Sequence, residues 1–349
     1  MAATSQKRHP LSWLTDAGYF QMPLWYPLHF LTTQMRPLPY PESDYSKKTC
    51  IVTGANVGLG KEAARHLCRL GAEKVVLACR DLEKGREAQV DIEASTQRKD
   101  VIDVWALDLG SFQSVIDFCQ RADTELERVD VVIENAGVAI GTYVEVDGGY
   151  ESSIGVNVVS TFLMAFSLLP KLRKTAMRFN TEPRLVVVSS DAHMFAKFNE
   201  RTEKEIFESF KGKHSMSEDR YNTSKLLPIW IVRELAARMP TNDAVIVNCV
   251  NPGFCRTNLF RHAAFPLSYI VKFTLGCLGR DAEMGSRTLM AAAAADRQSH
   301  GKYMDSCIVR DPSNLVLSQE GTQLQKRIYQ ELVGVLEDIR QGISQNVNK

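Results

Sequence analysis

The stretch Thr49–Gly60 constrains the fold of this chain more than any other. It reads T-C-I-V-T-G-A-N-V-G-L-G, an apolar run followed by a turn with three glycines, and a helical pattern begins at Lys61. Strand, glycine turn and helix in this order can cradle a nucleotide diphosphate, because glycine lets the backbone approach the phosphates and the helix N-terminus offers N–H groups. The spacing, G-x-x-x-G-x-G, differs from the G-x-G-x-x-G fingerprint and from the phosphate-loop motif. Alone, the stretch indicates a nucleotide site or an ordinary glycine-rich turn.

Strand and helix signals alternate after this turn. Further strands are expected at 74–78, 101–107, 129–133, 184–188, 244–250 and 301–304, with helices at 60–70, 81–95, 111–126, 151–174, 221–239, 281–295 and 318–340. This alternation predicts an α/β fold, a doubly wound parallel sheet of Rossmann type with helices on both faces. We find no repeat or dividing linker. The prediction is one domain over 46–312, preceded by a Pro- and aromatic-rich arm (1–45) and followed by a helical tail (313–349).

Composition excludes several classes of protein. Lys and Arg number 42 against 41 Asp and Glu, so the net charge of +1 does not favour a nucleic-acid partner. The eight cysteines show no C-x-x-C pair and no metal-ligand spacing, which predicts reduced, buried thiols and no metal site. We find no secretory signal and no uncharged apolar run of the ~18 residues that a membrane span needs. A cytoplasmic protein is expected; its arm could pack its aromatics on the body, cover the substrate entrance or touch a membrane surface.

A second pattern lies at Tyr221-Asn-Thr-Ser-Lys225. Its phenol and ammonium stand at i and i+4, so they share one face of the expected helix. Such a pair is common by chance, but this one follows polar residues at two strand ends and one in a helix: Asn135-Ala-Gly137, Asn157 and Ser189-Ser190. All of them are expected to meet at the carboxyl edge of the sheet, where doubly wound folds bind ligands.

Together these motifs resemble the short-chain dehydrogenase/reductase family over about residues 47–310. The residues that carry the resemblance are Thr53–Gly60, Asp108-Leu109, Asn135-Ala-Gly137, Asn157, Ser190, Tyr221-x-x-x-Lys225 and Pro252-Gly253. The run Leu77–Gly85 resembles the retinol-dehydrogenase-like branch, and the chain is most similar to reductases of fungal natural-product pathways. The resemblance implies an oxidoreductase that interconverts a lipophilic ketone and a secondary alcohol by hydride transfer.

The catalytic roles follow from this resemblance and from charge. Tyr221 would act as the acid, or as the base in the reverse direction, although a free tyrosine has a pKa of about 10. A positive charge ~4 Å away, at an effective dielectric near 20, is worth about 4 kcal/mol and would lower that pKa by about 3. We expect Lys225 to supply the charge. The resemblance also implies that Lys225 binds the nicotinamide ribose, that Ser190 holds the carbonyl oxygen and that Asn157 anchors a proton-relay water.

The cofactor is expected to be NADP(H). About 20 positions past the glycine turn, an acidic residue would accept from the ribose 2′-OH of NAD, but here Arg80 stands, with Lys84 one helical turn later. Both could neutralise a 2′-phosphate; the alternative is that Asp81 takes the ribose. The resemblance implies that Asp108 contacts the adenine and that Thr257 holds the nicotinamide amide. It also implies that the cofactor is bound by Gly54, Asn56, Gly58, Leu59, Gly60, Asn135, Gly137, Pro252 and Gly253.

Several features depart from the family pattern. Glu134 replaces the first Asn of N-N-A-G, as a carboxylate beside the cofactor channel or a solvated strand end. Pro228 should cost ~3 kcal/mol or kink its helix, unless that helix starts later. An insertion at 191–219 is expected to be partly helical around 203–210, with His193 and His214 as ordinary loop residues.

Three further points stay open at this level. The apolar segment 254–280 could be a lid for a lipophilic small-molecule substrate or plain core packing. The helices at 151–174 and 217–239 form dimer faces in many relatives, so a homodimer could form unless the arm, insertion or tail blocks them. The alternative functions are a nucleotide-sugar epimerase or dehydratase, whose glycine turn usually reads G-x-x-G-x-x-G, and a catalytically silent nucleotide-binding scaffold.

Overall fold

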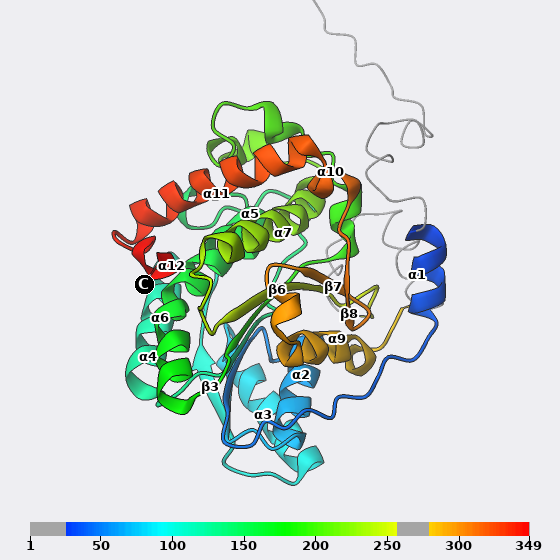
Figure 1. Cartoon of the computed structure of the whole chain (residues 1–349), viewed down its shortest axis with the longest axis vertical. Helices are drawn as coiled ribbons and strands as arrows, with labels where there is room; N and C mark the ends of the chain where they lie inside the picture. The colour runs from blue at the N-terminus through cyan, green and yellow to red at the C-terminus, as the bar shows by residue number, and fades with distance from the viewer. Residues whose placement is uncertain (1–25, 257–278, 349) are drawn as a thin grey trace, which may run out of the picture.

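A central sheet of eight strands organises the protein (Figure 1). The structure is a computed structural model that describes residues 26–256 and 279–348. The strands are Thr49–Thr53 (β1), Lys74–Cys79 (β2), Ile102–Ala106 (β3), Val131–Glu134 (β4), Arg184–Val188 (β5), Ile246–Asn251 (β6), Tyr303–Asp305 (β7) and Ile308–Arg310 (β8). Their order in the sheet is β3-β2-β1-β4-β5-β6-β7-β8, and every pair except β7–β8 is parallel. The predicted doubly wound α/β fold is therefore confirmed; β8 was not predicted.

Three helices cover the first face of the sheet. They are Gly58–Arg69 (α2), Leu82–Thr96 (α3) and Ala282–Ala294 (α9), and their apolar sides bury a continuous cluster with the strands. Local signals fix their ends as predicted. Gly71 adopts φ +96° just beyond α2, and the Asp81 carboxylate caps α3 by accepting from the Lys84 N–H at 3.1 Å.

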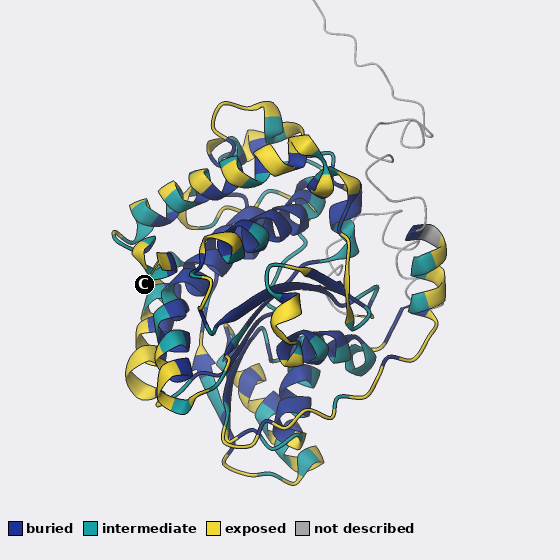
Figure 2. Cartoon of the chain, in the orientation of Figure 1, coloured by how far each residue is buried: buried dark blue, intermediate teal, exposed yellow. Residues whose placement is uncertain are grey.

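The opposite face carries two layers. The inner layer consists of Phe112–Glu125 (α4), Ser152–Ile154 (α5), Thr161–Phe179 (α6) and Arg220–Arg238 (α7). The C-terminal helices Asn314–Leu317 (α10), Gln319–Ile339 (α11) and Gln345–Asn348 (α12) form the outer layer, and α11 runs alongside α7 in Figure 1. Figure 2 shows α7 as almost wholly buried beneath it. The tail therefore belongs to the packed body.

The helix predicted for 151–174 is interrupted. Between α5 and α6, Gly155–Ser160 forms a π-helical turn, which inserts an extra residue into the helical repeat and often occurs at functional sites. Over Ser152–Phe179 an 18-residue window reaches a mean hydropathy of 1.7, so the expectation that no such run exists is wrong. Because 94% of that window is buried inside the protein, the segment is explained as a core helix.

The insertion after β5 is packed on the body. It contains four short 3-10 helices, Asp191–Phe195, Asn199–Thr202, Glu208–Phe210 and Lys213–Ser215, so the helix expected around 203–210 shrinks to one turn. Its Phe198 ring lies 5.7 Å from the Trp230 ring of α7. From α11, the Glu331 carboxylate accepts from the Ile206 N–H at 2.6 Å.

Helix α7 runs through Pro228. It begins at Arg220, so a late start does not remove the proline from the helix. Proline lacks the N–H that would bond to the carbonyl of Ser224, one turn earlier. The helix nevertheless continues to Arg238, since its sides are buried between the sheet and α11.

The arm contributes one helix to the described structure, Tyr26–Gln34 (α1), at the right edge of Figure 1. Its His29 Nε2 lies 2.7 Å from Asp305 Oδ2 at the end of β7. Arg280 donates to the Thr33 carbonyl at 2.7 Å. The Gln34 side chain donates to the Phe254 carbonyl and accepts from the Phe254 N–H. Helix α1 is thus attached to the carboxyl edge of the sheet.

Candidate active site

One large cavity occupies the carboxyl edge of the sheet. Its volume is about 1850 Å³, larger than the ~300–1,000 Å³ of ordinary small-molecule pockets. Most of the predicted site residues line it: Gly54, Asn56, Gly58, Leu59, Arg80, Lys84, Asp108, Asn135, Gly137, Ser190, Tyr221, Lys225, Pro252 and Gly253. The structure therefore brings the glycine turn and the Tyr/Lys pair to a common space, large enough for a dinucleotide and a second molecule.

The glycine turn requires glycine at the predicted positions. Gly54 and Gly58 adopt φ +64° and +62°, where side chains are rarely tolerated. A Cβ on Gly60 would lie 2.5 Å from Asn135 Nδ2 and 2.7 Å from the Gly54 carbonyl oxygen. Asn135 Nδ2 in turn donates to the Thr53 carbonyl at 2.9 Å. The backbone is therefore close-packed behind the turn and bare toward the cavity, which fits the diphosphate of a nicotinamide dinucleotide.

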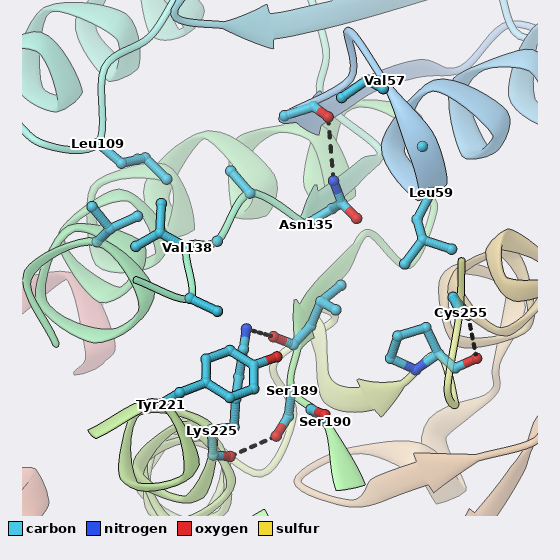
Figure 3. A pocket seen from close by; sticks show the side chains of 18 of the residues that line it. Val57, Leu59, Leu109, Asn135, Val138, Ser189, Ser190, Tyr221, Lys225 and Cys255 are labelled. Carbon is cyan, nitrogen blue, oxygen red and sulfur yellow. Dashed lines mark hydrogen bonds between the residues drawn. The ribbon is translucent and has the colours of Figure 1, made fainter. Parts of the chain in front are cut away.

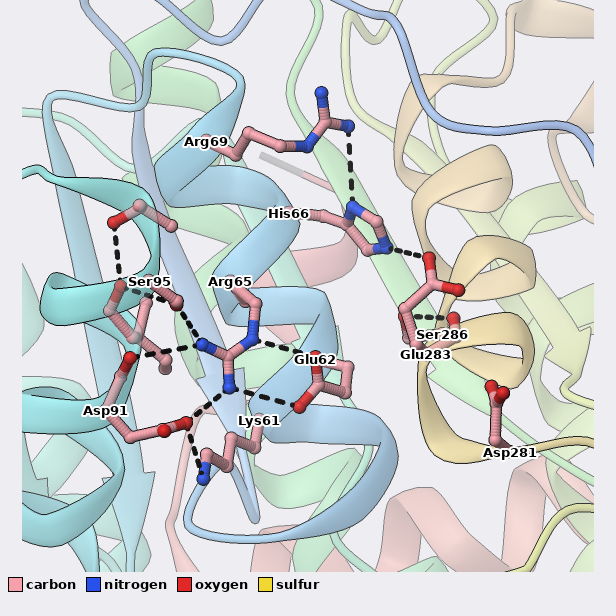
Figure 4. Close-up of polar contacts among 12 residues, drawn as sticks. Lys61, Glu62, Arg65, His66, Arg69, Asp91, Ser95, Asp281, Glu283 and Ser286 are labelled. Atoms are coloured by element: carbon pink, nitrogen blue, oxygen red, sulfur yellow. Dashed lines mark hydrogen bonds and ion pairs between the residues drawn. The ribbon is translucent and has the colours of Figure 1, made fainter.

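Polar contacts on both sides hold α2, the helix that follows this turn (Figure 4). Lys61 and Arg65 pair with Asp91 of α3, with a Lys61 Nζ to Asp91 Oδ2 distance of 2.8 Å. On the other side, His66 Nε2 lies 2.9 Å from Glu283 of α9. The N-terminus of α2 is consequently held in a fixed position toward the cavity.

The end of β2 presents Arg80 to the cavity. Arg80 is exposed there, while the carboxylate of Asp81 is occupied on both oxygens. One oxygen accepts from the Lys84 N–H, and the other pairs with Lys84 Nζ at 2.8 Å. The alternative that Asp81 takes a ribose hydroxyl is weakened, because that carboxylate already caps α3.

Tyr221 and Lys225 lie in the first turns of α7 and face the same end of the cavity (Figure 3). Lys225 Nζ donates to the Val188 carbonyl at 3.1 Å. Ser189 donates its hydroxyl to the Lys225 carbonyl at 2.6 Å and so serves to fasten α7 to β5. Ser190 lines the cavity and is hydrogen-bonded to the Tyr221 side chain. This arrangement favours Ser190 over Ser189 as the serine that faces a substrate.

The acid–base properties differ from the prediction. Burial raises the pKa of Tyr221 to about 12, against the opposing effect of its hydrogen bond to Ser190. Burial also lowers the pKa of Lys225 to about 8. The expected lowering of the tyrosine pKa by Lys225 is wrong for this structure, because enclosure penalises the phenolate and the ammonium alike.

Asn157 lies behind the cavity. Its Nδ2 donates to Ser224 Oγ and to the Val138 carbonyl, both at 2.9 Å, while its Oδ1 accepts from the Val138 N–H at 2.8 Å. A Cβ on Gly137 would lie 3.1 Å from Asn157 Oδ1 and 3.3 Å from Lys225 Nζ. Asn157, on the π-helical turn, thus joins the loop after β4 to α7 beside the ammonium; its role as a water anchor remains a prediction.

Two of the sequence interpretations need correction. Glu134 is neither a solvated strand end nor a cavity residue: it is 4% exposed, and its carboxylate has no hydrogen-bond partner among the described residues. It shares a sheet face with Val132, toward α4, and this burial raises its pKa well above the usual value. A neutral carboxylic acid is therefore expected there.

His193 is not an ordinary loop residue. It is fully buried; its Nδ1 lies 2.8 Å from the Ser190 carbonyl, and its Nε2 accepts from the Ser313 N–H at 3.1 Å. Burial lowers its pKa to about 4, so the ring is neutral and donates from Nδ1. His193 thus ties Ser190 to the C-terminal segment. His214, by contrast, is exposed as expected.

Most cysteines within the described residues are buried, as predicted, while the absence of a metal site stays a prediction. No group of three or more potential ligands occurs there, and the seven cysteines within the described ranges are free thiols, six of them buried. Thr257 and most of the predicted lid lie outside the described residues. Phe254 and Cys255, at the start of that segment, line the cavity.

Some cavity residues were not among the predicted site residues. Three of them, Tyr26, Phe30 and Leu31, belong to α1 in the arm, and others are Lys61, Cys79, Val138 and Asn222. No spacing rule links the arm to the site. Its aromatic content was the only available signal, and it fitted several interpretations.

Comparisons with known proteins place the chain in a family. The sequence model described as short chain dehydrogenase matches residues 48–200. The chain is 44% identical over 325 residues to the short chain dehydrogenase/reductase dmxR8 of Cryptosporiopsis, covering 91% of this chain and 99% of the relative. It is 41% identical over 287 residues to the short chain dehydrogenase atnD of Emericella nidulans, covering 80% and 91%.

Solved structures agree. An uncharacterized protein from Mycobacterium Paratuberculosis superposes with a TM-score of 0.61 at 25% identity, covering 85% of this chain and 96% of that one. A short chain dehydrogenase from Escherichia coli CFT073, complexed with NADPH, gives 0.54 at 26% identity, covering 76% and 99%. The chain belongs to the short-chain dehydrogenase/reductase family. It is an oxidoreductase, and its similarity to fungal members of that family is confirmed.

Proposed function

We propose that this protein is an NADP(H)-dependent reductase that interconverts a lipophilic ketone and a secondary alcohol. The observation that carries the proposal is the shared cavity, lined at one end by the glycine turn and Arg80 and at the other by Ser190, Tyr221 and Lys225. The NADPH bound to the E. coli structure supports the choice of cofactor. The fungal relatives support a role in secondary-metabolite biosynthesis.

The cofactor would lie along the carboxyl edge of the sheet. Backbone N–H groups at Gly58 and Leu59 would hold the diphosphate, and Asp108 would lie near the adenine. Arg80 would pair with the 2′-phosphate, with Lys84 beside it. When bound, the nicotinamide supplies the hydride to a carbonyl carbon or takes it back from an alcohol.

The chain's own residues manage the oxygen and its proton. Ser190 would donate a hydrogen bond to the carbonyl oxygen. Tyr221 would release its hydroxyl proton to that oxygen as the carbon gains the hydride, so one hydride and one proton convert the ketone to the alcohol. With a pKa of about 12, Tyr221 is protonated at neutral pH, the form that a reduction needs. The Lys225 ammonium would then stabilise the resulting phenolate.

The cavity walls support a lipophilic substrate. Apolar side chains line the cavity, among them Phe30, Val138, Phe195 and Phe254. Such walls exclude water from the reacting carbonyl and bind apolar surface at roughly 25 cal/mol per Å² removed from water.

The cellular setting is also part of the proposal. Free, buried thiols support a reducing, cytoplasmic location. The helix faces through which a homodimer could form are covered by the tail: the Phe166 ring of α6 lies 6.1 Å from Tyr329 of α11, and Arg233 of α7 donates to Gln325 at 3.0 Å. A homodimer, if one forms, would use another face.

The direct test is loss of absorbance at the nicotinamide band when NADPH and a panel of ketones are mixed with the protein. The proposal expects oxidation that depends on the ketone and is slower with NADH. Binding of NADPH without turnover of any ketone would support the silent scaffold and overturn the proposal.

A further inference from the structure

Helix α1 reaches the active-site cavity from outside the segment that matches the family. The family match begins at residue 48, whereas Tyr26, Phe30 and Leu31 line the cavity from α1. The wall that they form therefore comes from the arm, ahead of the first strand of the sheet. It stands near Ser190, because the Tyr26 side chain is hydrogen-bonded to Asp191, the residue that follows Ser190.

Several contacts fix α1 in this position. His29 pairs with Asp305, Arg280 donates to the Thr33 carbonyl, and the Gln34 amide makes two hydrogen bonds with the Phe254 backbone. These contacts join α1 to the ends of β6 and β7. Helix α1 is consequently held against the edge of the sheet where the cavity lies.

A buried carboxylate places Tyr26 next to the catalytic serine. Asp191 follows Ser190 directly and is hydrogen-bonded to the Tyr26 side chain and to the Tyr303 hydroxyl, the latter at 3.1 Å. Tyr26 is only 4% exposed. With its hydroxyl held by Asp191, Tyr26 offers the cavity the apolar part of its ring.

Aromatic rings continue from Tyr26 along the wall. The ring centroids of Tyr26 and Phe30 are 6.0 Å apart, and those of Phe30 and Phe254 are 6.4 Å apart. Both separations fall within the range of aromatic pairs, which prefer offset or edge-to-face contacts with another ring. Phe195, from the insertion, lines the same cavity. A row of rings suits a flat aromatic surface better than a puckered aliphatic one.

We propose that Tyr26, Phe30 and Phe254 form an aromatic wall that determines specificity, and that the substrate is an aryl ketone whose aromatic ring packs against it. The inference rests on the proposed ketone reduction and narrows its substrate class. Tyr26 and Phe30 act on specificity alone and take no part in the proton transfer.

A matched pair of ketones tests the wall. 1-Tetralone and 1-decalone share one carbon skeleton, but only the first carries an aromatic ring. Replacing Phe30→Leu removes a ring and keeps apolar bulk. Relative to wild type, kcat/KM for 1-tetralone should fall roughly two- to tenfold, the range of one aromatic contact, while that for 1-decalone stays within about twofold. Leu28→Ala, on the same helix but 71% exposed and outside the cavity, is the control and should change neither.

The outcomes separate this inference from the proposed function. If wild-type protein oxidises NADPH with ketones but Phe30→Leu lowers kcat/KM equally for both ketones, the aromatic wall is refuted and the proposed reductase activity stands. If no turnover occurs, calorimetry can measure the dissociation constants of both ketones with the NADP⁺ complex. The Phe30→Leu substitution should then weaken the binding of 1-tetralone alone. Phe254→Leu should repeat the pattern; unchanged 1-tetralone binding in both variants overturns the inference.

Discussion

The two ends of the cavity are built in different ways. The cofactor end is made of backbone: a turn whose glycines are required by φ or by close approach, followed by a helix held between α3 and α9. The substrate end is made of side chains from segments far apart in the chain, with His29 and Asp305 paired across 276 positions. One end is a local motif, and the other exists only after the whole chain has folded.

This difference explains where specificity can vary. A backbone cradle accepts any nucleotide of the right shape and tolerates almost no substitution, so it preserves the shared chemistry. Side chains of the arm, the insertion and the segment after β6 can change without disturbing the sheet. Connecting segments of this kind are the expected place for a change of substrate.

The largest expected effect concerns the proposed proton donor at the substrate end. Tyr221→Phe removes the proton donor and should lower kcat roughly 10²- to 10⁴-fold, the usual range for general acid catalysis, while NADPH binding measured by fluorescence stays within about twofold. Tyr143→Phe is the matched control, because Tyr143 is outside the cavity and its hydroxyl donates to the exposed Glu145 at 2.6 Å. Retention of full activity in Tyr221→Phe would rule out the mechanism.

The cofactor end should be the less tolerant of the two. Gly60→Ala would place a Cβ against Asn135 and the Gly54 carbonyl, so the turn must shift, and we expect a loss of roughly 10²-fold in kcat/KM for NADPH. Gly334→Ala on α11 is the control, since no atom lies within 4 Å of its added Cβ. If Gly60→Ala and Gly334→Ala had the same kcat/KM for NADPH, the close packing behind the glycine turn would be contradicted.

Cofactor preference tests a side chain at this same end. Arg80→Asp should reduce the preference for NADPH over NADH by roughly ten- to a hundredfold, because a charged hydrogen bond is worth about 1.5–3 kcal/mol. The readout is the ratio of kcat/KM values for the two nucleotides. Arg86→Asp, on an exposed position of α3 outside the cavity, should leave that ratio unchanged. An unaltered ratio in Arg80→Asp would end the assignment of Arg80 to the 2′-phosphate.

The smallest effect is a pH dependence at the substrate end. The pKa of Lys225 is lowered to about 8, so its ammonium is present below pH 8 and is lost as the pH rises through that value. Below pH 8 the buried ammonium of Lys225 lowers the stability of the folded protein, but the proposed reaction requires its charge. We expect kcat/KM for NADPH, which reports groups of the free enzyme, to be halved near pH 8. A flat profile from pH 7 to 9 would contradict this role.

Sequence reasoning worked where local chemistry decides the structure. Apolar runs located the seven parallel strands, and Asp81 and Gly71 marked helix ends, because capping and positive φ depend on neighbouring residues. The π-helical turn around Asn157 was missed, since its residues carry an ordinary helical pattern. The role of His193 depends on Ser313, 120 positions away. No pattern in the sequence predicts such a contact.

In the cavity, too, local motifs predicted some features, and features that depend on the whole fold were not predicted. Motifs predicted the residues that would bind the cofactor, and the structure brings most of them to one cavity. The pKa of Tyr221 was not predictable, because the motif names its neighbour Lys225 but says nothing of how deeply both groups are buried. The aromatic wall was equally hidden, since it requires α1 to dock on Phe254.

The most direct measurement is hydride transfer traced with deuterium. NADPH carrying deuterium at the transferring C4 position is incubated with the protein and 1-tetralone, and the product is examined by mass spectrometry and NMR. The account predicts a single stereoisomer of 1-tetralol with one deuterium on the carbinol carbon, formed by wild-type protein and not by Tyr221→Phe. Product without deuterium at that carbon, or NADPH bound and never oxidised in the presence of any ketone, would contradict it.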